Sequence, residues 1–492
     1  MSGIHSPFRG LTLMFRKAVA VATFSLLVPV MAAVAAPTVA SVAAPRTSSG
    51  VAPLSAPART ADLVPTAEWR NHPRTSPANT TPAWGPSFNN PARGGSTAAR
   101  RNIERIYRMI QSTKGYRVAR PSRCPGHERN WPNRIRIALY SFSDNRVADA
   151  LIRAHRRCVS VQVLMNDHLS NRDVPAFGRL QNALGHDRTR RSWARRCQRG
   201  CRGSVGPLHT KMYLFSRTGK ANKVVVFGSS NMTGKAANVQ WNDLFVWKGR
   251  VGLYDQFTTI FKESARDRRA PAPIERNYRN GVLKTMFWPQ PGHTKATDRV
   301  LKALQEVRCG MRPTGGTGYA GHTAVAINIH AMEGDRGLYI AQYIVKMKKA
   351  GCRVRVLYGL IAPRIHRTFK NGGVPTRRTI FDRDDNGLTD MYTHMKYVGI
   401  NGVVGGDRSA RVMYTGSENF SQKTIGGDEV WQRIPMTKAW RPYQNLFDMI
   451  WNSNFYSNPK YAFYQQSSTP IHARMQQYNP DALLITGEDL EE

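Results

Sequence analysis

The sequence predicts an α/β protein, internally duplicated into two similar α-β-α lobes with the active site at their interface. Two observations lead to this prediction. A β-rich run, a helical run and a second β-rich run follow one another twice along the chain. Each of these units then leads to a His-x-Lys motif and, after an apolar run, to Gly-Ser-x-Asn. The same order occurring twice indicates a duplicated half, and a short helical crossover implies parallel strands.

The first half begins with a helix near Ala98, because apolar residues recur there at helical spacing. The alternating and β-branched runs that follow predict strands, and the run between them predicts a helix. The expected order is strand 135–140, helix 148–155, strand 159–164 and, before the first Gly-Ser-x-Asn, strand 224–227. Residues 168–206 are rich in arginine and lack periodicity, which favours a long loop near the active face.

The second half repeats this order with its own residues. The expected elements are strand 324–329, helix 338–349, strand 353–358 and, before the second Gly-Ser-x-Asn, strand 412–414. We therefore expect a first lobe over residues 99–292 and a second lobe over residues 293–466.

The ends of the chain read differently from the two halves. Arg9, Arg16 and Lys17 precede an apolar run that ends in small residues, which is typical of a secretory signal peptide over residues 1–35. Met14 is an alternative start. Residues 36–98 are rich in Ala, Pro, Ser and Thr and predict a disordered linker. Residues 467–492 predict a polar tail. The expected location is therefore extracellular.

The charge of the chain is strongly positive. Lys and Arg number 72 against 32 Asp and Glu, which gives a net charge of +40 and a pI near 10.7. Such a field attracts phosphate-rich partners, either nucleic acid or an anionic membrane surface. The charge does not choose between them, and a secreted protein from a source with Arg-rich proteins is the alternative interpretation.

Export makes the six cysteines candidates for disulfides. Cys158 and Cys352 lie at matching places before the second strand of each half, and Cys124 and Cys309 each precede the first strand. The predicted pairs are Cys124–Cys158, Cys309–Cys352 and the local pair Cys197–Cys201. A zinc site made of Cys197, Cys201 and a histidine is the alternative, although a four-ligand pattern is absent.

A second possible ion site lies in the segment that follows. Asp382, Asp384 and Asn386 resemble the start of a calcium loop, but Thr393 stands where the twelfth-position Glu is expected. A solvated turn is the alternative. We otherwise expect neither a metal nor a cofactor.

The two motif pairs carry the chemistry. They consist of His209, Lys211, Ser229 and Asn231 in the first half and His394, Lys396, Ser417 and Asn419 in the second. In a strand, His-x-Lys places both side chains on one face. Imidazole can act as nucleophile or as acid because its unperturbed pKa is near ~6.5. The lysines would neutralise phosphate oxygens, and the hydroxyl and amide groups would add hydrogen bonds.

Each histidine also needs an acceptor that fixes its tautomer. Asp243 and Glu429 fall at similar distances after each Gly-Ser-x-Asn, so we expect them to be the orienting carboxylates. Asp428 is the alternative to Glu429.

These motifs resemble those of the phospholipase D superfamily, whose bilobal members carry H-x-K-x4-D-x6-G-S-x-N twice. The resemblance covers about residues 101–465. It implies a metal-independent phosphohistidine intermediate, with His209 as nucleophile and His394 as general acid. The chain departs from the pattern at the motif Asp, which is Ser216 in one copy and Asn401 in the other. The gaps to Gly-Ser-x-Asn are also longer, which implies altered lobe packing or activity.

Three functions fit these features. The first is a secreted phospholipase D that hydrolyses or transfers the headgroup of membrane glycerophospholipids, acting as a monomer because both motifs are in one chain. Apolar side chains would then rim its cleft, with candidates Trp131, Trp193, Phe287, Trp288 and residues 360–362. Core packing or loop anchoring is the alternative that we favour for each of them. The second is a secreted nuclease on the same fold, favoured by the positive charge. The third is a catalytically weakened, basic phosphate-binding protein.

Overall fold

The computed structural model describes residues 80–115, 131–168, 174–203, 205–383 and 389–459. All of them belong to one compact unit, Val64–Glu492. The predicted signal peptide, the C-terminal tail, Cys124 with its bridge to Cys158, and Asp384 and Asn386 of the calcium-like loop lie outside the described residues.

The first lobe is built on a seven-stranded sheet in the order β1-β8-β6-β5-β2-β3-β4. Strands β2, β3 and β4 are parallel to one another, and the remaining neighbours are antiparallel. The bounds are β1 (Gly85–Phe88), β2 (Arg134–Leu139), β3 (Ser160–Asn166), β4 (Trp193–Cys197), β5 (Lys211–Thr218), β6 (Ala221–Gly228) and β8 (Asp243–Trp247).

The second lobe repeats this sheet strand for strand, in the order β13-β12-β11-β15-β16-β17-β10-β9. Its parallel strands are again the three at one side, and β9 is an additional edge strand. The bounds are β9 (Arg276–Asn280), β10 (Leu283–Phe287), β11 (Ala324–Met332), β12 (Arg353–Ile361), β13 (Thr376–Arg378), β15 (Lys396–Val404), β16 (Asp407–Gly416) and β17 (Val430–Ile434). The predicted duplication is therefore confirmed, and it extends to β1 of the first sheet, whose counterpart in the second is β10.

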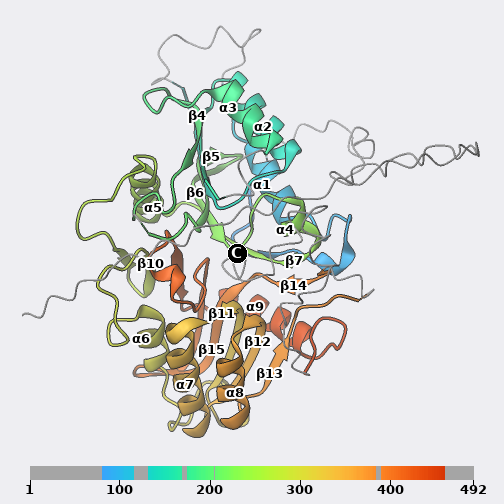
Figure 1. Ribbon diagram of the computed structural model, residues 1–492, viewed down its shortest axis with the longest axis vertical. Coiled ribbons are helices and arrows are strands. Elements are labelled where there is room, and N and C mark those ends of the chain that lie inside the picture. The colour runs from blue at the N-terminus through green and yellow to red at the C-terminus, as the bar shows by residue number, and fades with distance from the viewer. Residues whose placement is uncertain (1–79, 116–130, 169–173, 204, 384–388, 460–492) are drawn as a thin grey trace, which may run out of the picture. The chain divides into compact units, whose positions relative to one another are not determined.

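Some helices cover the outer face of each sheet, and others lie between the two sheets (Figure 1). In the first lobe they are α1 (Arg101–Gln111), α2 (Asn145–Arg156), α3 (Pro175–Leu184), α4 (Gly234–Asn238) and α5 (Val251–Ser264), with the short 3-10 helix η1 (Pro91–Arg93). In the second lobe they are α6 (Arg299–Gln305), α7 (Gly334–Lys349), α8 (Pro363–Asn371) and α9 (Thr437–Trp451), with η5 (Lys423–Ile425). Helices α1–α3 and α6–α8 form the outer layers, whereas α5 and α9 contribute to the core between the sheets.

Local sequence explains these elements. Helix α2 starts after Asp144, whose side chain accepts a hydrogen bond from the backbone N–H of Val147, and its last turn is basic. Its buried residues recur at helical spacing and pack on the sheet. The alternating residues of β2 and β11 explain why both were predicted as strands.

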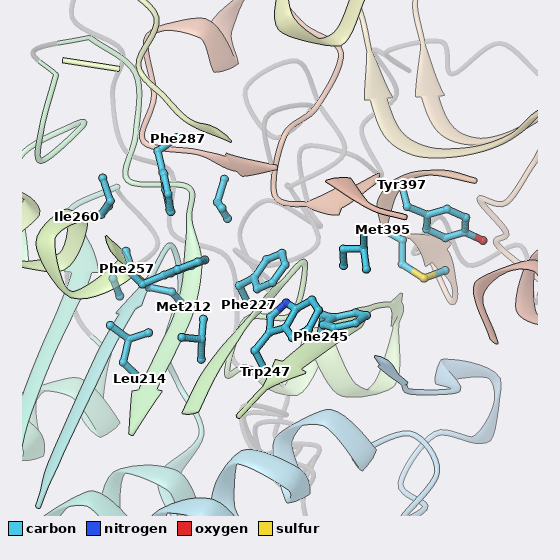
Figure 2. Close-up of a cluster of buried hydrophobic side chains, with 14 of the residues drawn as sticks. Met212, Leu214, Phe227, Phe245, Trp247, Phe257, Ile260, Phe287, Met395 and Tyr397 are labelled. Atoms are coloured by element: carbon cyan, nitrogen blue, oxygen red, sulfur yellow. The ribbon is translucent and has the colours of Figure 1, made fainter. Parts of the chain in front are cut away.

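An apolar core joins the two lobes and holds the site between them (Figure 2). Aromatic side chains from the first lobe, including Phe245, Trp247 and Phe257, meet Phe287 and Tyr397 of the second. The rings of Phe257 and Phe287 lie edge to face at 4.9 Å. Because buried apolar area drives association, this interface fixes how the two sheets face each other.

A third, two-stranded sheet also crosses between the lobes. Strand β7 (Gln240–Trp241) of the first half pairs in parallel with β14 (Tyr392–Thr393) of the second. Both strands directly precede residues of the candidate site.

Three predicted boundaries were wrong. The expected linker 36–98 contains β1, which pairs with β8, and the expected first lobe contains β9 and β10, which belong to the second sheet. The arginine-rich segment 168–206 contains α3 and β4 rather than a loop alone. Strands β1 and β9 are short edge strands with few apolar residues, so periodicity could not reveal them. Helix α3 and strand β10 do have periodic buried apolar residues, a signal that was overlooked.

The structure contains two of the predicted bridges, Cys309–Cys352 and Cys197–Cys201. Because a disulfide leaves no thiolate to bind metal, the zinc alternative at Cys197 and Cys201 is not supported. Among the residues that the structure describes, no helix is long and apolar enough to cross a membrane.

Candidate active site

Backbone pairing between the lobes places each motif histidine beside a residue of the other lobe. The N–H of His209 donates to the carbonyl of Asp428 at 3.1 Å, and the N–H of His394 donates to the carbonyl of Trp241 at 2.9 Å. In both cases the acceptor immediately precedes the residue that contacts the imidazole. The two halves therefore exchange equivalent segments across one site.

The first imidazole contacts a carboxylate. His209 Nδ1 lies 2.6 Å from Glu429 Oε1, and both side chains are buried. The other oxygen of Glu429 accepts a hydrogen bond from the Ser417 hydroxyl. When Glu429 is ionised it can only accept, so Nδ1 of His209 then carries the proton and Nε2 presents a lone pair.

The second imidazole contacts a neutral amide. His394 Nδ1 lies 2.9 Å from Asn242 Oδ1. The orientation of this amide is fixed because Asn242 Nδ2 donates to the carbonyl of Ala236 and to Gln240 Oε1. Nδ1 of His394 must therefore donate, and Nε2 is the nitrogen available for proton transfer.

Asp243 is not the orienting carboxylate that the sequence predicted. It accepts hydrogen bonds from Ser229 at 2.7 Å and, from the second lobe, from Thr415 and Tyr443 at 2.6 Å each. The N–H of Ser229 bonds to the carbonyl of Asp243, as the N–H of Ser417 does to that of Val430. The duplication therefore aligns Asp243 with Val430, and Asn242 with Glu429.

Asp428, the alternative to Glu429, also has another partner. Its Oδ2 accepts the backbone N–H of Arg202 at 3.1 Å. Burial raises the pKa of Asp428 to about 6. Its contribution to the site is the carbonyl that holds the backbone of His209.

The lysines lie beside their histidines. Lys211 Nζ donates to the carbonyl of His209 at 2.8 Å, and Lys396 Nζ donates to that of His394 at 2.6 Å. Both are fully buried. Two ammonium groups in a dry site favour an anion there, because their charges are poorly screened.

The serines and asparagines of the motifs brace the site. The hydroxyls of Ser229 and Ser417 donate to Asp243 and Glu429, so they hold carboxylates rather than stand free for a phosphate. Asn231 Oδ1 accepts the N–H of Ser141, and Asn419 Oδ1 accepts that of Ala331. Asn419 Nδ2 is buried without a partner among the described residues, which leaves it as a donor for a ligand.

The residues that replace the motif Asp have structural contacts. The Ser216 hydroxyl accepts the N–H of Arg134 at 2.8 Å, and Asn401 Nδ2 donates to the carbonyl of Gly318 at 3.1 Å. Each ties a central strand to a neighbouring segment of its own lobe. The loss of the Asp therefore leaves the two motif histidines in place.

Burial sets the electrostatics of the site. It lowers the pKa of His209 well below its usual value, and Lys211 and Lys396 lower it further. Burial and Lys396 do the same to the pKa of His394. Burial, with the nearby Glu418, raises the pKa of Glu429 well above its usual value. Both imidazoles are therefore mainly neutral when no anion is bound. A neutral ring suits the nucleophile, whereas protonation of the acid then depends on the charge of the bound substrate.

Arg336 braces the second Gly-Ser-x-Asn from outside the site. Its buried guanidinium binds Asp298 at 2.9 Å, Glu418 of the motif, and the carbonyl of Asn419 at 3.0 Å. These partners hold the pKa of Arg336 above its usual value despite burial.

Most candidates for an apolar rim are core residues, which was the alternative interpretation of each. Trp131, Trp193, Phe287 and Trp288 are buried, as is Leu360. His209 and His394 have an exposed fraction of 0%, so the surrounding side chains must move apart for a substrate to reach them.

Sequence reasoning missed Asn242 and two rings that flank the motif histidines. The ring of Tyr140 lies 5.5 Å from that of His209, and the ring of His330 lies 4.9 Å from that of His394. The signal for Asn242 was its place directly before Asp243. The signal for the rings was their shared position at the end of the first strand in each half.

One family model matches part of the chain. Residues 132–265 match the family model described as a cardiolipin synthase, phospholipase D-like domain. No curated protein matches the sequence.

Several solved structures resemble the fold at low sequence identity. Polyphosphate kinase from Porphyromonas gingivalis is 10% identical with a TM-score of 0.44, and the match covers 76% of this chain and 52% of the kinase. Phosphatidylserine synthase from Haemophilus influenzae is 12% identical with a TM-score of 0.47, over 71% of this chain and 88% of the synthase. A phospholipase D family member, Nuc from Salmonella typhimurium, is 17% identical with a TM-score of 0.25, over 38% and 98%.

This chain thus spans about half the length of the kinase and most of the synthase. The domain match lies in the first lobe and includes His209, Lys211 and the first Gly-Ser-x-Asn, and the duplicated second lobe completes the site. Residues 132–265 are thus similar to a phospholipase D-like domain, and the second lobe repeats the sheet of that domain.

Proposed function

We propose that this protein is a secreted, metal-independent phospholipase D that cleaves the headgroup from glycerophospholipids through a phosphohistidine. The observation that carries the proposal is the pair of buried imidazoles whose Nδ1 atoms are held by Glu429 and Asn242, which leaves both Nε2 atoms for chemistry. The ring centroids of His209 and His394 lie 6.4 Å apart, so both motif histidines belong to one site.

The first step forms a covalent intermediate. His209 Nε2 attacks phosphorus, the bond from phosphorus to the headgroup oxygen breaks, and protonated His394 gives its proton to that oxygen. Glu429 stabilises the positive charge that develops on His209, since it accepts from Nδ1 at 2.6 Å. Lys211 and Lys396 neutralise the non-bridging oxygens.

The second step regenerates the enzyme. His394, now neutral, removes a proton from water or from an acceptor alcohol, the new oxygen–phosphorus bond forms, and the bond to His209 breaks. Water gives hydrolysis, and an alcohol gives headgroup transfer.

A secreted nuclease on the same site is the second candidate. The net charge of +40 favours it, because a polyanion gains from each neutralised phosphate. Both candidates need the same two histidines, whereas a phosphate-binding protein without turnover does not.

The test is the release of choline from phosphatidylcholine vesicles in EDTA, with the wild type compared with His209→Ala. Thermal melting of both proteins serves as the folding control. Release by the wild type alone supports the proposed phospholipase D. Nicking of plasmid DNA without choline release moves the assignment to a nuclease. Neither activity in a folded wild type refutes a hydrolase acting on these substrates.

A further inference from the structure

A third buried histidine lies at the site and has no place in the steps above. His330 is on β11, is 1% exposed, and points to the same face of the sheet as Ala326 of the core between the lobes. Its ring lies 4.9 Å from the ring of His394 at 62°. It is thus on the side of the site where the proton donor works.

The tautomer of His330 follows from its hydrogen bond. Nδ1 lies 2.9 Å from the carbonyl of Thr393, which can only accept, so Nδ1 carries the hydrogen. Burial and the charges of Lys396, Lys235 and Lys211 lower its pKa and keep the ring neutral. Nε2 therefore presents a lone pair.

That lone pair has no partner among the described residues. Nε2 of His330 shares this property with Nε2 of His209 and of His394. A buried acceptor without a donor costs free energy, so functional sites are where such atoms are expected. A non-bridging phosphate oxygen cannot satisfy it, because that oxygen is itself an acceptor. A hydroxyl group or a water molecule can.

The duplication identifies the residue of the first lobe that is equivalent to His330. The N–H of Ser141 bonds to Asn231, as that of Ala331 bonds to Asn419, so the preceding residues Tyr140 and His330 are equivalent. Each ring flanks the motif histidine of its own lobe. The first lobe has a phenol at this position. The second has an imidazole whose Nε2 is a strong hydrogen-bond acceptor.

We propose that His330 Nε2 accepts a hydrogen bond from the water that attacks the phosphohistidine, and so positions that water beside His394. The water gives one proton to His394 Nε2, its oxygen bonds to phosphorus, and the bond from phosphorus to His209 breaks with its electron pair on nitrogen. The second hydrogen, which points to His330, stays on the oxygen that is now bonded to phosphorus. His330 exchanges no proton and is a positioning residue for the second step. The inference rests on the proposed function.

Two variants separate the roles of the two ring nitrogens. In His330→Asn the amide N–H₂ can replace Nδ1–H toward Thr393, but nothing replaces Nε2. In His330→Gln the amide oxygen reaches the place of Nε2, but the donor to Thr393 is lost. Tyr140→Phe is the matched change at the equivalent position of the first lobe.

The measurement is stopped-flow hydrolysis of bis(p-nitrophenyl) phosphate, in which the burst of nitrophenolate reports the first step and the later linear phase reports the second. We expect His330→Asn to keep the burst rate within about threefold and to slow the linear phase about 10- to 100-fold. His330→Gln should recover part of the linear phase, and Tyr140→Phe should leave the ratio of the two rates unchanged.

Other outcomes overturn the inference. A merely structural role for His330 slows both phases together and makes Asn and Gln equally harmful. An unchanged linear phase in His330→Asn also refutes it, and leaves the proposed function standing if the wild type shows a burst. A folded wild type that releases no nitrophenolate refutes the proposed function itself, and the inference with it.

Discussion

The asymmetry between Glu429 and Asn242 can be tested by giving both histidines a carboxylate. In Asn242→Asp, a carboxylate would stand about where Oδ1 now lies, 2.9 Å from His394 Nδ1. The pKa of His394 is held well below its usual value by burial and Lys396. Since the general acid must be protonated, kcat/KM of the wild type should fall as pH rises through this pKa.

The size of the effect follows from the geometry. Two unit charges about 4 Å apart interact by about 4 kcal/mol at an effective dielectric constant of about 20. That energy corresponds to about 3 pKa units, and burial of the new carboxylate reduces it, so an increase of about 1 to 3 units is expected. The alkaline limb of the pH profile should move to higher pH by the same amount.

The assay is the pH dependence of kcat/KM on bis(p-nitrophenyl) phosphate and on a diester with an alkyl leaving group, which depends more on the acid. Asp243→Asn is the matched control, because it changes a neighbouring carboxyl group that bonds to Ser229, Thr415 and Tyr443 but not to His394. An alkaline limb that stays in place in a folded Asn242→Asp protein would show that His394 is not the acid or that Asn242 does not set its pKa.

The remaining predictions concern the partner of His209 and the frame around the site. Glu429→Gln should lower kcat about 100-fold or more, since it removes the charge that stabilises the positively charged intermediate, and steady-state kinetics will show it; a loss confined to KM contradicts this role. Arg336→Met leaves Asp298 and Glu418 as buried, uncompensated carboxylates, and it should lower the free energy of unfolding by about 3–5 kcal/mol in urea titrations at pH 7. This loss of stability should shrink at acidic pH, because the two carboxylates become protonated. A variant as stable as the wild type would refute this account of the network. Replacing Cys309 and Cys352 with Ser opens a loop with a sequence separation of 43 and should cost about 4 kcal/mol in the same titration, whereas an unchanged midpoint would mean that the bridge constrains the unfolded chain little.

Much of the fold could be predicted from the sequence because its central strands have strong periodicity. The runs that became β2, β3, β11 and β12 are apolar and β-branched, and each pair is separated by one amphipathic helix. Strand β1 could not be found this way. Its residues Gly85–Phe88 include a proline and a serine, and they form a strand because the edge of β8 offers them hydrogen bonds.

The sequence motifs predicted part of the candidate site and missed the rest. The motif histidines and lysines were found because they recur, and the structure brings both copies together. Asn242 was missed because only carboxylates were considered as orienting residues, and Asp243 is an acidic residue at a distance from its motif similar to that of Glu429. Only the backbone register, in which Ser229 bonds to Asp243 as Ser417 bonds to Val430, corrects the alignment.

His330 illustrates a different limit. A single histidine in an apolar strand has no spacing partner in the sequence, and most such residues are satisfied core residues. Its significance appears only when the fold sets its ring against His394 and leaves Nε2 without a donor from the part of the chain that the structure describes.

The most direct test of the central claim is to trap the covalent intermediate. The protein would be mixed with a phosphodiester labelled at phosphorus, quenched in alkaline denaturant that preserves phosphohistidine, and mapped by mass spectrometry. The account predicts that the label lies on His209 in the wild type and is absent from His209→Ala. With an activated leaving group, the label should increase in His394→Asn, because the second step then lacks its base. Label on His394, or turnover of substrate with no label on either histidine, would contradict it.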